Sequence, residues 1–239
     1  MPRLVLLMVR LDCAATSECV LDGMALHEHV RALTPTRRPL RIIRANARAY
    51  LGLNAIAYGL FVAGFVVGLL FPHLNEVQVT RLNEDGTTDL VRSLINQPWL
   101  FALTILGVNT LKMGAATIVL PSMIVPFAGI PLFAYWAFET GITLVPASDI
   151  GWVALIPHSL TLVIEVQAYV LFMLGAYVLG RHWVWSQSVG AENRRGGYAK
   201  GLRQLGWLSL AAFGLLVVGA VYEAFSLRYF VHPLAQWLL

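Results

Sequence analysis

The chain has 239 residues, of which 58% are hydrophobic and only 13% are charged, and its mean hydropathy is +0.68. A soluble domain carries about 25% charged residues, so this composition excludes an ordinary soluble domain and predicts an all-α, polytopic transmembrane helical bundle. The net charge of +4 does not indicate a nucleic-acid partner. Thirteen of the seventeen basic residues lie in 1–48 and 181–204, which flank apolar runs, and this distribution is typical of membrane proteins.

Residues 1–39 are predicted to form a cytoplasmic N-terminal tail. Its two cysteines, Cys13 and Cys19, are not expected to form a disulfide, because the cytoplasm is reducing. Their spacing, with His27 and His29 nearby, matches no standard zinc pattern. We therefore predict no metal and no cofactor for the tail or for the rest of the chain.

Residues 40–50 are predicted to form an amphipathic helix at the membrane interface. Arg41, Arg44 and Arg48 recur at spacings of three and four, which places them on one face of a helix. We expect these three arginines to face the lipid headgroups.

Five stretches approach or exceed the roughly 20 apolar residues that a transmembrane helix needs. They are about 51–71, 98–119, 126–145, 153–180 and 205–227. Residues 72–96 form a long outer loop, in which a turn signal at 83–86 allows a small β-hairpin. Residues 120–131 contain three prolines and form either a tight turn or a re-entrant break.

The basic residues orient these spans. With the N-terminus in the cytoplasm, thirteen basic residues lie on the cytoplasmic side and three lie outside. The opposite topology reverses this bias, so the positive-inside rule predicts a cytoplasmic N-terminus and an outer C-terminus. The segment 181–204 is then a basic cytoplasmic loop.

Glycines in the first and fourth spans predict close helix packing, because small residues let helix backbones approach each other in a membrane. The glycines concerned are Gly59, Gly64 and Gly68 in the first span, and Gly175 and Gly180 in the fourth.

Polar side chains within the spans are the candidate functional residues, because a charge at membrane depth costs about 2.5–3.5 kcal/mol on insertion scales. They are Asn109, Lys112, Glu139, His158, Glu165, Gln167 and Glu223. Three interpretations stay open: cross-links between helices, such as Lys112 with Glu165; docking of a partner helix; and a proton or cation path. Cross-linking is favoured. No catalytic motif is present, so an enzyme is not predicted.

Three motifs resemble the stage II sporulation protein M family of bacterial and archaeal membrane proteins. In the fourth span, Pro157-His158 is followed by Glu165-Val-Gln-Ala168 and by the small-residue run 175–180. The last span contains Ala220-Val-Tyr-Glu-Ala224, and the second span contains Asn109 followed by Gly114 and Pro121. The resemblance covers about 40–235, although Ser159 stands where the family usually has glycine.

The resemblance implies a non-catalytic scaffold or assembly subunit in a bacterial or archaeal cytoplasmic membrane. The expected partners are other membrane subunits, contacted through helix faces and the outer loop 72–96, together with membrane lipids. A cytoplasmic ATPase at loop 181–204 is a further expected partner, and nucleic acid is not expected. The alternative is a permease subunit, ABC-2-like or coupled to ions or protons, that uses the intramembrane polar residues.

Overall fold

The computed structural model describes residues 37–239, and every regular element in this range is helical. Predictions about residues 1–36, including Cys13 and Cys19, lie outside the described residues. The chain divides into two compact units, residues 1–41 and 42–239. The described part of the first unit is the beginning of helix α3, and all the remaining helices belong to the second unit.

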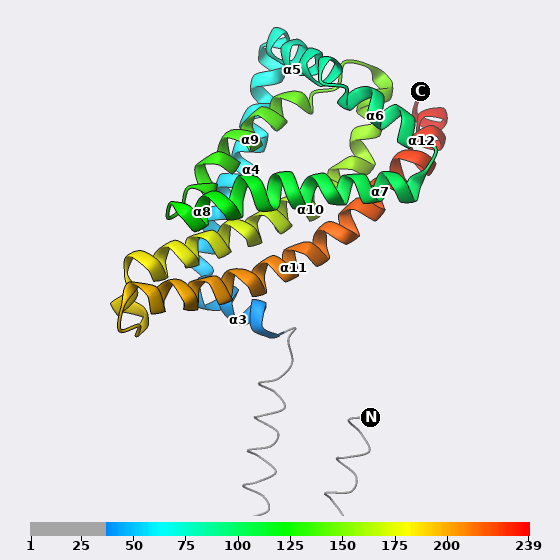
Figure 1. Cartoon of the computed structure of the whole chain (residues 1–239). Coiled ribbons are helices and arrows are strands. Elements are labelled where there is room, and N and C mark those ends of the chain that lie inside the picture. The colour runs from blue at the N-terminus through cyan, green and yellow to red at the C-terminus, as the bar shows by residue number, and fades with distance from the viewer. Residues whose placement is uncertain (1–36) are drawn as a thin grey trace, which may run out of the picture. The chain divides into compact units, whose positions relative to one another are not determined.

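In chain order, the helices are α3 (Arg37–Ala45), α4 (Ala47–Leu70), α5 (Pro72–Glu84), α6 (Thr87–Leu94), α7 (Pro98–Gly107), the π-helix η1 (Val108–Val119), α8 (Leu120–Ile124), α9 (Gly129–Thr143), α10 (Asp149–Val184), the 3₁₀-helix η2 (Ser186–Val189), α11 (Arg194–Tyr229) and α12 (Val231–Leu238). Elements α7, η1 and α8 follow one another without a break and form one rod (Figure 1).

Four helical segments are long and apolar enough to cross a membrane: Ala47–Leu70, Pro98–Ile124, Asp149–Val184 and Arg194–Tyr229. They coincide with four of the five predicted spans and make the chain a multi-pass membrane protein. The remaining predicted span, 126–145, contains α9, which has 15 residues. At 1.5 Å per residue α9 is about 22 Å long, shorter than the roughly 30 Å of a hydrocarbon core.

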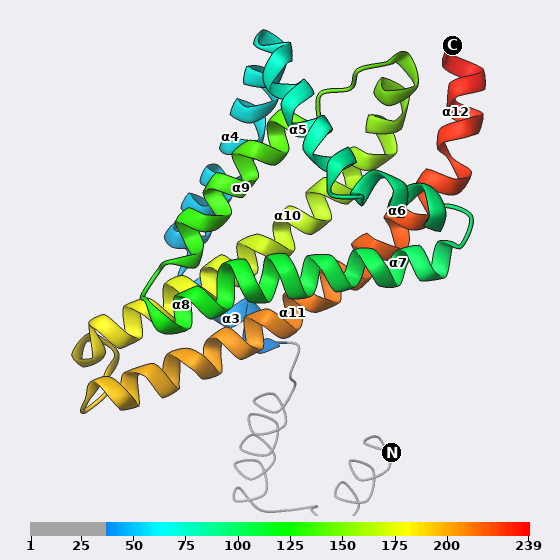
Figure 2. The same cartoon turned by 45° about the horizontal axis from the view of Figure 1, so that its top comes forward.

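Helices α10 and α11 form an antiparallel hairpin through the middle of the fold (Figures 1 and 2). Each helix has 36 residues, or about 54 Å. Both are longer than predicted because Ser148 and Asn193 cap their N-termini with side-chain oxygens. The prediction of a loop over 181–204 is therefore wrong. Most of these residues are helical, and only a short connection joins α10 to α11.

Helices α4 and α9 pack in parallel on one side of α10 (Figure 1). Their contact depends on glycine: a Cβ on Gly64 would lie 2.1 Å from the carbonyl oxygen of Phe138, and one on Gly141 would lie 2.3 Å from that of Phe61. Any side chain at these positions would push the helices apart. Fully buried residues, Phe133 and Tyr169 among them, fill the space between this pair and α10.

The predicted outer loop 72–96 consists of the two helices α5 and α6, so the β-hairpin alternative is wrong. Pro72 is the first residue of α5, where its missing N–H is tolerated. The predicted turn at 83–86 connects α5 to α6, and Gly86 in it has φ 79°. The Thr87 hydroxyl and backbone N–H bond the Asp85 carboxylate and hold its pKa below the usual value.

Helix α5 is fixed to the end of α9 by one buried side chain. Asn75 donates to the carbonyl oxygens of Ile142 at 2.8 Å and Val145 at 3.2 Å. The last carbonyls of a helix have no partner within it; Ile142 is in the last turn of α9 and Val145 follows the helix, so Asn75 joins the start of α5 to the C-terminal end of α9.

The segment 120–131 is a tight turn. Helix α8 continues to Ile124, and α9 begins five residues later at Gly129. The Gly129 N–H donates to Ser122 Oγ at 2.9 Å, and a Cβ on Gly129 would overlap the backbone of Ile118. Phe127 takes the left-handed conformation, with φ 68°. These local contacts hold the turn that contains the prolines.

The predicted interfacial helix 40–50 is divided between two helices. Helix α3 ends at Ala45, where the Asn46 side chain bonds the Ile42 carbonyl, and residues 47–50 already belong to α4. Arg41, Arg44 and Arg48 are all exposed, and their contact with lipid headgroups stays a prediction.

Candidate functional site

Helix α10 carries three of the seven candidate polar residues, His158, Glu165 and Gln167, and it presents them on two different faces. His158, Thr161, Glu165 and Tyr169 follow one another at spacings of three and four, so they share one face. Gln167 lies about 200° around the helix from Glu165 and belongs to the other face. The first face contacts η1 and α11, and the second contacts α4.

Glu165 is the most deeply buried carboxylate among the described residues, with 8% of its surface exposed. The amide of Asn109 donates to its Oε1 at 2.5 Å, which joins η1 to α10. Gly219 of α11 makes room for it, because a Cβ there would lie 3.2 Å from Glu165 Cγ. The proposed Lys112–Glu165 pair does not form. Lys112 is exposed and has no ion pair among the residues described, while Asn109 takes its place.

A second polar contact on this face joins α10 to α11. His158 Nδ1 lies 3.3 Å from Glu223 Oε1, and Glu223 is close enough to Glu165 for the two carboxylates to interact electrostatically. The sequence predicted the shared face of His158 and Glu165. Glu223 is added to it by the antiparallel pairing of α10 and α11.

Two buried hydroxyls lie along the same face of α10. Thr161 and Tyr169 are at most 1% exposed, and neither hydroxyl has a hydrogen-bond partner among the described residues. We call His158, Thr161, Glu165, Tyr169 and Glu223, together with Asn109, the carboxylate cluster. Within 37–239, no group of three or more His, Cys, Asp or Glu side chains is arranged to hold a metal ion.

Gln167 joins α10 to α4 through a complete hydrogen-bond network. Its Oε1 accepts from Tyr50 Oη at 2.7 Å, and its Nε2 donates to Asn54 Oδ1 at 2.6 Å and to Tyr58 Oη at 2.9 Å. Tyr58 in turn donates to the carbonyl of Val163 at 3.2 Å. Such a network fixes the register of two helices, and nothing in it is left to bind a ligand.

Glu139 has a similar cross-linking role near the C-terminal end of α9. Its Oε1 accepts from Tyr135 Oη at 2.6 Å, one turn earlier in the same helix, and from Gln78 Nε2 of α5 at 3.4 Å. The Glu139 carboxylate therefore lies apart from the carboxylate cluster.

Four of the five predicted packing glycines lie at close contacts. Gly64 and Gly68 contact α9, Gly175 contacts Leu205 of α11, and Gly180 lies under the ring of Phe127. Gly59 does not share this role: it is exposed, and a Cβ there would meet no atom within 4 Å. It lies on the face of α4 that turns away from α9.

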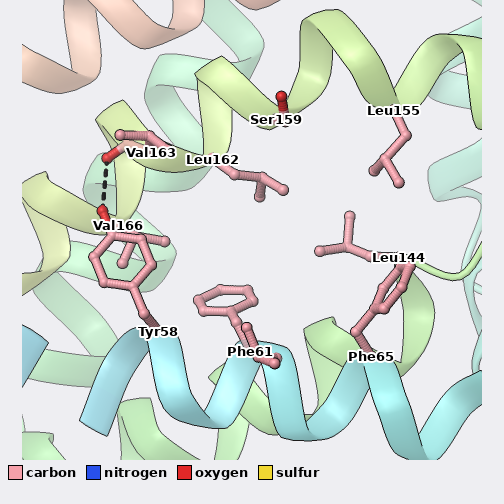
Figure 3. Close-up of a pocket in the computed structure, with 10 residues that line it drawn as sticks. Tyr58, Phe61, Phe65, Leu144, Leu155, Ser159, Leu162, Val163 and Val166 are labelled. Atoms are coloured by element: carbon pink, nitrogen blue, oxygen red, sulfur yellow. Dashed lines mark hydrogen bonds between the residues drawn. The ribbon is translucent and has the colours of Figure 1, made fainter. Parts of the chain in front are cut away.

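An apolar cavity of about 280 Å³ separates α4 from α10 (Figure 3). Phe61, Phe65, Leu144 and Leu162 point into it, and Ser159 lies on its α10 wall (Figure 3). The Ser159 hydroxyl bonds the carbonyl of Ile156 in its own helix. The cavity therefore offers hydrocarbon surface, and the carboxylate cluster does not line it.

Sequence reasoning missed several members of these networks. Tyr50, Asn54 and Tyr58 recur every four residues in an otherwise apolar helix, which is a readable signal for a polar stripe. Asn75 lay in a segment predicted as a loop. Thr161 and Tyr169 carry no such signal, because only the packing of the helices shows that their hydroxyls are buried without a hydrogen-bond partner among the described residues.

Comparisons with known proteins identify no relative: no protein-family model, no curated protein and no solved structure matches this chain.

Proposed function

We propose that the chain crosses the cytoplasmic membrane of a bacterium or archaeon five times, with its N-terminus inside and its C-terminus outside. Contacts at two opposite ends of the fold support this topology. Asn75 bonds the end of α9, and Arg228 bonds Asn96 at the outer end. Tyr198 bonds Met123 at the cytoplasmic end.

Helix α9 is the fifth crossing in this topology. It begins beside the α8 end, near the cytoplasmic contacts, and finishes beside Asn75, near the outer ones. The apolar residues 125–128 and 144–146 that flank the helix add the length that its 15 residues lack.

Within this topology, the protein is a non-catalytic membrane subunit that assembles with other membrane proteins, as the resemblance to the stage II sporulation protein M family implies. The observation that carries the proposal is that the polar side chains of the predicted spans form hydrogen bonds between helices. Gln167 joins α10 to α4, Asn109 joins η1 to α10, and Glu139 joins α9 to α5. Polar contacts of this kind fix helix packing in membranes and build a rigid frame.

Extraction in a mild detergent tests this proposal. A tagged chain, expressed at its natural level, is expected to purify with other membrane polypeptides in fixed stoichiometry, so that the particle mass exceeds the 26.3 kDa of the chain and its detergent belt. Recovery of the chain alone, in several mild detergents and in native lipid discs, would contradict an assembly role.

The carboxylate cluster favours a second candidate, a permease subunit coupled to protons or cations. Cross-linking two helices does not require two carboxylates and a histidine in one place, and the cost of charge at membrane depth makes such clusters typical of ion and proton pathways. The unbonded hydroxyls of Thr161 and Tyr169 extend the cluster along α10.

Proton flux into liposomes separates the two candidates. For a permease, an imposed pH gradient should dissipate faster in vesicles with the wild-type chain than in empty vesicles. Glu165→Gln should abolish the difference, while Glu192→Gln, the same change at an exposed carboxylate, should leave it. Wild-type vesicles that leak no faster than empty ones would rule out autonomous proton transport.

A further inference from the structure

The cytoplasmic end of the α10–α11 hairpin contains a cavity with a composition unlike that of the cavity in Figure 3. It has a volume of about 320 Å³ and is lined by Met123, Trp183, Arg194, Arg195 and Tyr198. Three helices contribute: α8 supplies Met123, α10 supplies Trp183, and α11 supplies the arginines and the tyrosine. We call it the arginine cavity.

The walls of the arginine cavity are held in place by two contacts. The rings of Trp183 and Tyr198 meet edge to face, with centroids 5.1 Å apart, and Tyr198 Oη donates to the carbonyl of Met123 at 3.2 Å. These contacts join all three helices, so the cavity is part of the folded hairpin.

Within residues 37–239, no acidic side chain pairs with either of the two arginines. Neither Arg194 nor Arg195 makes an ion pair or a side-chain hydrogen bond among the described residues. Glu192, the nearest acidic residue in the sequence, is exposed and likewise unpaired within the described part of the chain. A guanidinium presents a planar set of donors that matches a phosphate, so this pair offers recognition for an anion.

The surroundings of the cavity indicate that the anion belongs to a lipid. Ile124 and Val125, next to Met123, are 75% and 56% exposed, so apolar surface leads from the cavity toward the hydrocarbon core. Tryptophan and tyrosine are enriched at the membrane interface, and basic pockets between helices on the cytoplasmic side bind anionic headgroups. A soluble anion would need no adjoining apolar surface.

We infer that the arginine cavity binds the phosphate of one anionic phospholipid of the cytoplasmic leaflet, with the acyl chains over Ile124 and Val125. The inference rests on the proposed topology, which places this end of α10 and α11 inside. Phosphatidylglycerol fits the chemistry because it carries a phosphate and no ammonium group. The two arginines would repel an ammonium group.

Native mass spectrometry of the purified full-length chain tests the inference by titration with phosphatidylglycerol or phosphatidylcholine. We expect one phosphatidylglycerol to bind at least tenfold more tightly than phosphatidylcholine. Arg194→Gln with Arg195→Gln should remove this preference. The matched control, Arg81→Gln with Arg92→Gln, removes the same charge at the opposite end and should keep it. If the double variant fails to fold, each single variant is tested instead. Each is expected to weaken phosphatidylglycerol binding about fivefold, because one basic residue near an anionic membrane surface contributes about 1 kcal/mol.

Three results would overturn the inference: equal binding of both lipids, an unchanged preference in the Arg194/Arg195 variants, or displacement of the lipid by millimolar inorganic phosphate, which would indicate a soluble anion. Failure of the inference is distinguishable from failure of the topology. If labelling places residue 187 in the cytoplasm and no lipid preference is found, the lipid site alone is wrong.

Discussion

Single polar side chains decide how the membrane helices of this protein fit together. Gln167 bonds three side chains of α4, and the Asn75 amide N–H₂ donates to two carbonyl oxygens at and beyond the end of α9. Within a membrane no water replaces the hydrogen bonds of an amide, so the partners of Gln167 on α4 fix the register of α4 and α10. Glu165 differs from these two amides. Its carboxylate bonds a single partner, the amide of Asn109, and it lies near a second titratable carboxylate, that of Glu223.

Replacement of Gln167 tests this role directly. Gln167→Met keeps the volume but removes the bonds to Tyr50, Asn54 and Tyr58, so we expect a loss of about 2 kcal/mol of stability, given about 0.6 kcal/mol for an average intramembrane hydrogen bond and the added cost of unpaired groups. Thermal unfolding in detergent measures it as a lower melting temperature.

The matched control for Gln167 is Gln97→Met. Gln97 is exposed, and its side chain makes no hydrogen bond within residues 37–239. Equal melting temperatures for the two variants would show that the network contributes nothing to stability.

At the scale of helices, glycine contacts and helix ends determine the arrangement. The α4–α9 pair depends on the close approach at Gly64 and Gly141. In the α10–α11 hairpin, Ser148 and Asn193 cap the N-termini, and each helix, with 36 residues, is longer than a membrane is thick. Long helices of this kind cross a bilayer tilted.

Gly64→Ala measures the α4–α9 contact. The new methyl group would lie 2.1 Å from a backbone oxygen, so the helices must separate, and we expect a destabilisation of about 1–3 kcal/mol, the usual cost of overpacking. Gly59→Ala on the same helix meets no neighbour and should be neutral or slightly stabilising. Equal effects at the two positions in thermal unfolding would show that α4 and α9 are not in contact at Gly64.

Much of this arrangement was predictable from the sequence, and what was missed has a physical reason. Apolar length predicted the four long helices, because a span needs only to match the membrane thickness. The α5 and α6 helices were missed because 72–96 is polar enough to lie outside the membrane, where length and hydropathy carry no signal. The pairing of Glu165 with Asn109 instead of Lys112 depends on how η1 is rotated, and spacing along one helix does not specify the rotation of another.

At the scale of the whole molecule, the functional proposals depend on one topology. The carboxylate cluster approaches the outer face through His158 and Glu223, and the arginine cavity opens to the cytoplasm, only if α4 starts from a cytoplasmic N-terminus. The structure gives four long candidate spans, and α9 is the fifth in the proposal. Because Tyr50 bonds Gln167 and Tyr58 bonds Val163, α10 runs antiparallel to α4. If the N-terminus lay outside, every crossing would therefore reverse its direction, and the two sites would exchange sides.

Labelling of single cysteines in intact cells tests this claim most directly. In a chain with Cys13→Ser and Cys19→Ser, one cysteine is introduced in place of Gln187, between α10 and α11, or in place of Gln236 in α12; both glutamines are exposed. A membrane-impermeant maleimide is then applied before and after lysis. Five crossings predict that Gln236→Cys reacts in intact cells and that Gln187→Cys reacts only after lysis. The opposite pattern would contradict the topology and, with it, the sidedness of both sites.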